Sequence, residues 1–151
     1  MQTLMALPDP GVYFGLFCIA LLAATLIPMQ SEAVLTGLLL AGNQPVVGLL
    51  VSASAGNILG STINWWLGRH LEKYHDRKWF PIKPDQLSRA AKWYHRYGRW
   101  SLLLSWTPII GDPLTFVAGV LREPFWSFMT IVAVAKTARY CIIALALRSL
   151  I

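Results

Sequence analysis

The chain has 151 residues, of which 56% are apolar and only 13% are charged, whereas a soluble domain carries about a quarter charged residues. This composition excludes an ordinary soluble protein and favours the bilayer as solvent. The formal net charge of +6 lies in residues 69–99, which hold nine basic and three acidic residues. A basic segment in a neutral apolar chain is typical of a small integral membrane protein with a cytoplasmic loop, so nucleic-acid binding is not needed to explain the charge.

The first apolar run predicts a helical hairpin that enters the membrane and returns. This run covers residues 12–41, and Pro28 and the polar residues up to position 32 interrupt it. The apolar stretch that follows has about nine residues, which as a helix cover only ~14 Å of a ~30 Å hydrocarbon core. Irregular backbone at membrane depth is tolerated only where it is buried in protein or lines a wet cavity. We therefore expect a re-entrant hairpin over residues 12–42.

The second apolar run, residues 45–67, is long enough to span the membrane. Gly56 and Gly60 form a small-xxx-small pattern that allows close approach of a neighbouring helix and is compatible with a homo-oligomer. A polar stripe follows one helix face at steps of three and four residues: Ser54, Asn57, Ser61 and Asn64. The stripe either forms hydrogen bonds between helices or lines a cavity, and both interpretations stay open.

The basic segment, residues 69–99, is expected to contain an amphipathic helix capped at Pro84–Asp85 and stopped at Gly98. Basic residues on one face oppose an apolar face, which suits either a helix lying on anionic headgroups or a loop that fixes the topology. The basic stripe is Arg89, Lys92, Arg96 and Arg99, and the apolar stripe is Leu87, Ala90, Ala91 and Tyr94. The three histidines of this segment lack metal-ligand spacing, and we expect no metal or other cofactor.

The third apolar run, residues 100–121, repeats the interruption seen in the first. Its helix breaks are expected at Pro108, Gly111 and Pro113, because a proline removes a backbone donor and clashes with the preceding turn. It predicts a second re-entrant hairpin. The last run, residues 125–147, again has the length of a full span.

These elements form an internal repeat. A shift of 80 residues lays Pro28 on Pro108 and Glu32 on Asp112. One hairpin plus one span crosses the membrane once, so the second copy must be inverted, which is an architecture typical of secondary transporters. The sequence thus predicts a single all-α membrane domain over residues 1–151, in which the first hairpin enters from the outer side and the second from the cytoplasmic side.

Four ionisable residues fall inside the apolar runs: Glu32, Asp112, Lys136 and Arg139. Each would cost ~3 kcal/mol or more at the centre of an isolated helix, so they must pair or face water. In a functional site the two acids would take up protons and the two cations would attract an anionic head group. Polar side chains expected to support the site are Asn57, Ser61, Asn64 and Ser105. The alternative is a static ion-pair cluster that holds the hairpins together.

Seven short motifs, each occurring once, are distributed along nearly the whole chain. They are SEAVL at 31–35, GNILG at 56–60, LGR at 67–69, RYG at 96–98, LLLSWTPIIGD at 102–112, VAGVLR at 117–122 and AKTARY at 135–140. Jointly they resemble the YqaA branch of the DedA membrane proteins, also called the VTT or SNARE-associated family. The resemblance implies a multi-pass protein of the bacterial inner membrane with two opposed re-entrant hairpins. It also implies transport or scrambling of lipids such as undecaprenyl phosphate, coupled to protons.

The family's functional residues carry over unevenly. The acid after the first break corresponds to Glu32. The broader family has an arginine three residues before and another three residues after the proline of the second hairpin, and this chain has Ser105 and Gly111 there. Arg139 and Lys136 are the candidates to replace the missing cations.

The function expected from the sequence is therefore a flippase or scramblase for an anionic phospholipid or a polyprenyl phosphate, with membrane lipids and protons as its partners. The alternatives are a proton-coupled transporter of a small ion or solute, and a membrane-homeostasis protein that transports nothing. We expect no enzymatic activity, because the chain has no Cys-x5-Arg, HExxH or GxSxG motif.

Overall fold

The computed structural model describes residues 8–25, 30–71, 83–107 and 110–150, and every element of secondary structure in them is a helix. In chain order the elements are α1 (Pro10–Thr25), α2 (Gln30–Ala41), α3 (Val46–Leu71), α4 (Pro84–Tyr97), the 3-10 helix η2 (Gly98–Trp106), α5 (Gly111–Val120) and α6 (Phe125–Leu150). The predicted all-helical architecture is confirmed for this part of the chain.

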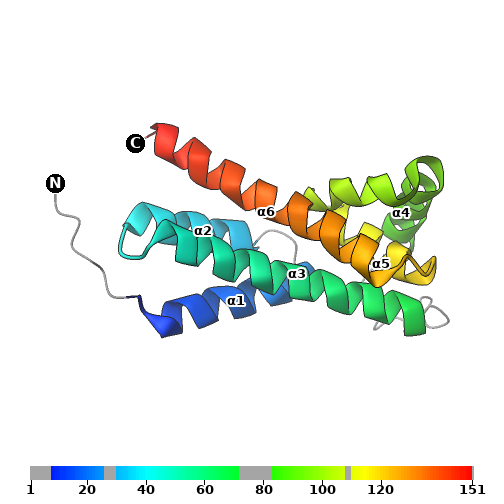
Figure 1. Cartoon of the computed structure of the whole chain (residues 1–151), viewed down its shortest axis with the longest axis horizontal. Helices are drawn as coiled ribbons and strands as arrows, with labels where there is room; N and C mark the ends of the chain where they lie inside the picture. Colours follow the sequence, from blue (N-terminus) through cyan, green and yellow to red (C-terminus); the bar gives the residue numbers. More distant parts are fainter. Residues whose placement is uncertain (1–7, 26–29, 72–82, 108–109, 151) are drawn as a thin grey trace.

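The two longest helices are α3 and α6, with 26 residues each. Both are apolar and long enough to cross a membrane, since 26 helical residues extend ~39 Å. Each continues three or four residues beyond the predicted spans of 45–67 and 125–147. Figure 1 shows the pair running along the long axis of the molecule, with α1 and α2 beside one half of α3 and α5 beside the other half, where α4 packs on α5.

The helices α1 and α2 flank the first interruption. The predicted break at Pro28 lies outside the described residues. At the other end of these helices, the backbone N–H of Asp9 donates to Gln44 Oε1 at 3.1 Å, so α1 begins close to the point where α2 has ended. The chain therefore leaves this end of the molecule along α1 and returns to it along α2 (Figure 1).

The two glycines of the small-xxx-small pattern on α3 allow the close approach of a neighbouring helix, as predicted. A Cβ atom at Gly56 would lie 2.2 Å from the Phe17 carbonyl oxygen, and one at Gly60 would lie 2.5 Å from Ala24 Cβ. These distances are too short for any side chain larger than hydrogen, so the two glycines let α1 lie directly against α3.

The second interruption differs from the predicted pair of α-helices. Its first arm, η2, is a 3-10 helix of nine residues, and its second arm is α5. Gly111 and Pro113 were expected as breaks, but both lie in the first turn of α5. Proline fits there because the first backbone N–H groups of a helix have no intrahelical acceptor. The interruption thus lies between Trp106 and Gly111, and the predicted break at Pro108 lies outside the described residues.

The amphipathic helix of the basic segment is α4, which ends at Gly98 (φ +63°) as predicted. The predicted cap at Pro84–Asp85 is wrong by one residue, because Lys83 occupies the cap position and Pro84 is the first helical residue. The apolar face packs inside the protein, where Ala90 and Tyr94 are buried, while the basic residues of the opposite face are exposed.

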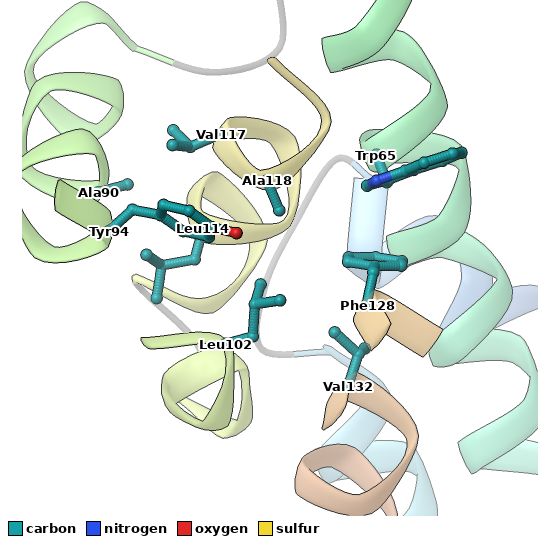
Figure 2. Close-up of a cluster of buried hydrophobic side chains, with 9 residues drawn as sticks. All are labelled: Trp65, Ala90, Tyr94, Leu102, Leu114, Val117, Ala118, Phe128 and Val132. Carbon is teal, nitrogen blue, oxygen red and sulfur yellow. The ribbon is translucent and has the colours of Figure 1, made fainter. Parts of the chain in front are cut away.

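A hydrophobic core joins α4 to the rest of the molecule. Figure 2 shows its nine buried side chains, which come from α3, α4, η2, α5 and α6. They are Trp65, Ala90, Tyr94, Leu102, Leu114, Val117, Ala118, Phe128 and Val132. The Trp65 ring stacks on Phe128 with 5.8 Å between centroids. The core fixes α5, the second arm of the interrupted run, between the helix of the basic segment and the two long helices.

Glu123, between α5 and α6, ties the same elements together by hydrogen bonds. Its carboxylate accepts bonds from the Tyr94 hydroxyl at 2.5 Å and from Ser127 Oγ at 2.9 Å, and its carbonyl oxygen accepts one from Trp65 Nε1 at 3.1 Å. Burial, and then the bond to Glu123, raise the pKa of Tyr94 above its ordinary value. The Tyr94 hydroxyl therefore remains protonated, and a hydrogen-bond donor, throughout the physiological pH range.

Candidate functional site

The four ionisable residues of the apolar runs come together around α6. Glu32 lies in the first turn of α2 and Asp112 in the first turn of α5, so each acid directly follows an interruption of the chain. Lys136 and Arg139 are three residues apart on α6 and share one helix face. The two interrupted runs thus present one carboxylate each to the same pair of cations.

Lys136 forms the more buried of the two ion pairs. Its ammonium lies 3.2 Å from Asp112 Oδ1 and also donates to Asn57 Oδ1. The lysine is only 1% exposed, and the Asp112 side chain is 22% exposed. The pair therefore joins α5 to α6 and α3 at a point that the surrounding helices shield.

Arg139 forms the second ion pair, with Glu32 Oε1 3.2 Å from its Nη1 atom. The same nitrogen donates to the Trp106 carbonyl oxygen at 2.8 Å, at the end of η2. The guanidinium also lies over the Tyr140 ring, 5.0 Å from its centroid. Its Nε atom is buried and has no hydrogen-bond partner within the described chain.

A cavity of about 250 Å³ opens beside the Arg139 pair. Its wall combines the charged pair with apolar and aromatic side chains: Glu32, Trp106, Thr107, Arg139, Ile142 and Ile143. Groups from α2, the end of η2 and α6 therefore surround a space in which a charged and an apolar surface meet.

Tyr140, which is not among the site residues predicted from the sequence, links the elements around these pairs. The residue is fully buried, and its hydroxyl lies 3.1 Å from Ser31 Oγ, accepts a bond from Asn57 Nδ2 at 2.9 Å and lies 3.4 Å from Arg139 Nη2. In a sequence, a tyrosine in an apolar span has the appearance of an aromatic anchor at the membrane interface. Its spacing of four residues from Lys136 is the pattern that places it on the face of the charged cluster.

The polar stripe of α3 is buried throughout. Besides its contacts to α6, it reaches other helices through Asn64, which donates to the Ala24 carbonyl oxygen at 2.9 Å and to Thr115 Oγ1 at 3.4 Å. Ser61 donates to the carbonyl oxygen of Asn57 at 3.1 Å, and Ser54 Oγ has no partner among the described residues. Both asparagines therefore form hydrogen bonds between helices, and none of the stripe lines the cavity beside Arg139.

Ser105 and Gly111 stand where the broader family is expected to carry arginines. Ser105 is buried, and no described atom bonds its hydroxyl. A Cβ atom at Gly111 would lie 2.5 Å from the Ser105 carbonyl oxygen. The contact between η2 and α5 therefore leaves no room for a side chain at residue 111. The cations that pair with the two acids are Lys136 and Arg139 of α6.

The network around Tyr140 predicts a measurable stability effect. Tyr140→Phe removes the hydroxyl and leaves the amide of Asn57 and the hydroxyl of Ser31 without their buried partner. We expect a loss of about 1–3 kcal/mol, the cost of leaving buried polar groups unsatisfied. Thermal unfolding in detergent measures it, with Tyr97→Phe on the exposed face of α4 as a control expected to change stability by less than about 0.5 kcal/mol. Equal unfolding temperatures for both variants would contradict the network.

Comparisons with known proteins find relatives along most of the chain. A family model described as the VTT domain matches residues 27–149. Inner membrane protein YqaA of Escherichia coli is 36% identical over 133 residues, which are 88% of this chain and 89% of YqaA. Undecaprenyl phosphate transporter A of Staphylococcus aureus is 28% identical over 136 residues, 83% of this chain and 67% of that protein.

An alkaline phosphatase-like protein of Lactococcus lactis is 26% identical over 129 residues, 78% of this chain and 60% of that protein. No solved structure matches the chain. The family match covers most of the sequence, the relative of highest identity among these is named for its place in the inner membrane, and two helices of this chain are long and apolar enough to span one. The chain therefore belongs to the VTT-domain, or DedA, family and is a bacterial inner-membrane protein.

Proposed function

We propose that this protein transports an anionic lipid across the membrane, as a flippase or scramblase for an anionic phospholipid or a polyprenyl phosphate. The observation that carries the proposal is the cavity beside the Glu32–Arg139 ion pair, in which a charged pair and apolar side chains such as Ile142 and Ile143 form one wall. An amphiphile with an anionic head and a hydrocarbon tail matches both parts of that wall. The name of the Staphylococcus aureus relative supports a polyprenyl phosphate as one such substrate.

In this proposal the cations of α6 bind the head group and the two acids control their availability. The buried Nε atom of Arg139 has no partner in the described structure, and a guanidinium binds phosphate through two parallel hydrogen bonds. Protonation of Glu32 would weaken its ion pair and release Arg139 for the phosphate. Asp112 would act in the same way on Lys136, which lies one turn away on the same helix.

The proposed topology is a single membrane domain over residues 1–151, with spans at 45–67 and 125–147 and the basic segment in the cytoplasm. Hairpins over 12–42 and 100–121 would enter from the outer and the cytoplasmic side. Two polar contacts support the proposed return of each hairpin to the side from which it enters. The Asp9 N–H donates to Gln44 Oε1 at 3.1 Å, and Arg99 Nε lies 3.6 Å from Glu123 Oε1. In Figure 1, α2 and α5 extend from the middle of the molecule toward opposite ends.

A transporter of a small soluble ion would use the same acids but would need a polar, closed cavity. The apolar side chains that line the cavity favour a lipid over a small ion. We also propose transport rather than catalysis, although the Lactococcus lactis relative carries an enzyme-like name. Proteoliposomes separate these alternatives: movement of labelled phosphatidylglycerol or labelled polyprenyl phosphate supports the proposal. Flux of a soluble cation without lipid movement, with or without a pH gradient, would overturn it.

The acids provide the sharper test. Glu32→Gln and Asp112→Asn keep the size of the side chains but cannot ionise, so each should still insert while slowing lipid movement by about tenfold or more. Asp112→Asn should also lower stability, because it leaves the buried Lys136 without its counter-charge. Asp85→Asn, on the exposed part of α4, is the matched control and should move lipid at the rate of the unchanged protein. Full lipid movement in both site variants, at unchanged unfolding temperature, would contradict the role proposed for Glu32 and Asp112.

A further inference from the structure

A second hollow lies on the other side of α6 from the cavity beside Arg139. The α6 residues that line it include Ala144, Leu145 and Arg148, whereas Arg139, Ile142 and Ile143 line the cavity. At 3.6 residues per turn these two sets occupy opposite faces of the helix. The hollow, called the α6 groove below, has a volume of about 730 Å³ and is bounded by the ends of α2 and α6 and the start of α3.

The lining of the α6 groove has the chemistry of a lipid site. Eight of its nine lining residues are apolar, and the ninth is Arg148, which is exposed in the last turn of α6. Within the described chain no acid pairs with Arg148. A groove of this volume is in the range that buries a small ligand, and Arg148, which no acid among the described residues pairs, calls for an anionic group.

The position of the α6 groove along the span fits the same ligand. From Cys141 to Arg148 the helix rises ~10 Å, which is less than the ~15 Å depth of one hydrocarbon leaflet. Arg148 lies two residues from the end of α6 and just beyond the proposed span of 125–147, where long cationic side chains reach the headgroup region. A lipid with its head at Arg148 would therefore lay its acyl chain along the groove within a single leaflet.

We infer that the α6 groove binds one anionic phospholipid, separately from the lipid that the Arg139 cavity is proposed to move. This inference requires that the chain spans the membrane and does not depend on transport.

A second copy of the chain fits the groove less well. A two-fold interface places the same patch against itself, so it would set one concave surface against another and bring two Arg148 side chains together without an acid between them. An anionic phospholipid instead supplies both the convex apolar chain and the negative charge.

Native mass spectrometry of the full chain in detergent, titrated with phosphatidylglycerol or phosphatidylcholine, tests the inference. We expect the α6 groove to bind one phosphatidylglycerol in preference to phosphatidylcholine, in addition to any lipid held in the Arg139 cavity. Arg148→Gln should weaken that binding about tenfold, the effect of losing a charge-assisted hydrogen bond, and Arg148→Lys should retain most of it. Ala144→Trp should fill the groove and abolish the binding, whereas Ala146→Trp, on the same helix but outside the lining, should leave it unchanged.

The measurement is repeated in an Arg139→Gln background to separate this site from the proposed transport site. The dependence on Arg148 should persist there, even if the transport proposal fails. Binding that disappears with Arg139→Gln and ignores both Arg148→Gln and Ala144→Trp would overturn the inference. A dimer that Ala144→Trp dissociates would also overturn it, in favour of a second copy in the groove.

Discussion

Replacing Lys136 with methionine should lower the free energy of unfolding by about 3–5 kcal/mol, the range for breaking a buried ion pair from one side. The change leaves the Asp112 carboxylate and the Asn57 amide oxygen without their cationic donor. Methionine is unbranched like lysine and only one heavy atom shorter, so the loss reports mainly the missing charge rather than a cavity. Thermal unfolding in detergent, followed by tryptophan fluorescence, measures the effect.

The double variant Lys136→Met, Asp112→Asn should recover most of that loss, because it leaves no unpaired charge at the contact of α5 and α6. Together with the two single variants it closes a double-mutant cycle, and a coupling energy well above 0.5 kcal/mol is expected for side chains in direct contact. Lys92→Met, on the exposed face of α4, is the control and should be close to neutral.

The same double variant separates a static ion pair from a transport site. If the pair only holds α5 against α6, restored stability should bring restored lipid movement. In the proposed mechanism the double variant stays folded but moves little lipid, because it has lost both a proton acceptor and a head-group ligand. Stability and lipid movement that return together would contradict the role proposed for Lys136 and Asp112.

The meeting of these charges could be predicted from the sequence because the bilayer leaves few alternatives. Two acids and two cations inside apolar runs each carry a high cost when unpaired, and they pair one to one, Glu32 with Arg139 and Asp112 with Lys136. The two long apolar helices and the amphipathic α4 were predictable for similar reasons, since helix length, a two-faced pattern and the stop at Gly98 each depend on one element alone.

Features that depend on contacts between elements could not be predicted in this way. Proline and glycine in residues 111–113 mark irregular backbone but do not say whether they end one helix or begin the next, and here they begin α5. The 3-10 form of η2 follows no local pattern that distinguishes it from an α-helix. Tyr140 contacts its three polar partners, Ser31, Asn57 and Arg139, only because α2 and α3 converge on α6 there, and spacing within α6 does not specify the partners from the other two helices.

Gly119→Ala should be among the most damaging small substitutions outside the charged cluster. A Cβ atom at Gly119 would lie 2.0 Å from the Trp65 carbonyl oxygen, and a Cβ atom at Gly68 would lie 2.1 Å from that of Phe116. The backbones of α3 and α5 touch at these two points, so no rotamer change can make room. We expect a loss of about 3 kcal/mol, at the upper end for overpacking, because the helices must separate and loosen the Trp65 contacts.

Thermal unfolding in detergent measures this loss, and Gly37→Ala is the matched control. A Cβ atom at Gly37 on α2 meets nothing within 4 Å, so alanine there should be neutral or stabilise the helix by up to about 1 kcal/mol. Once the methyl group at Gly119 has separated α3 from α5, a second one at Gly68 should cost much less than it does alone, because both act on one helix crossing. Additive losses in the double variant, or equal unfolding temperatures for Gly119→Ala and Gly37→Ala, would show that the two backbones do not meet as described.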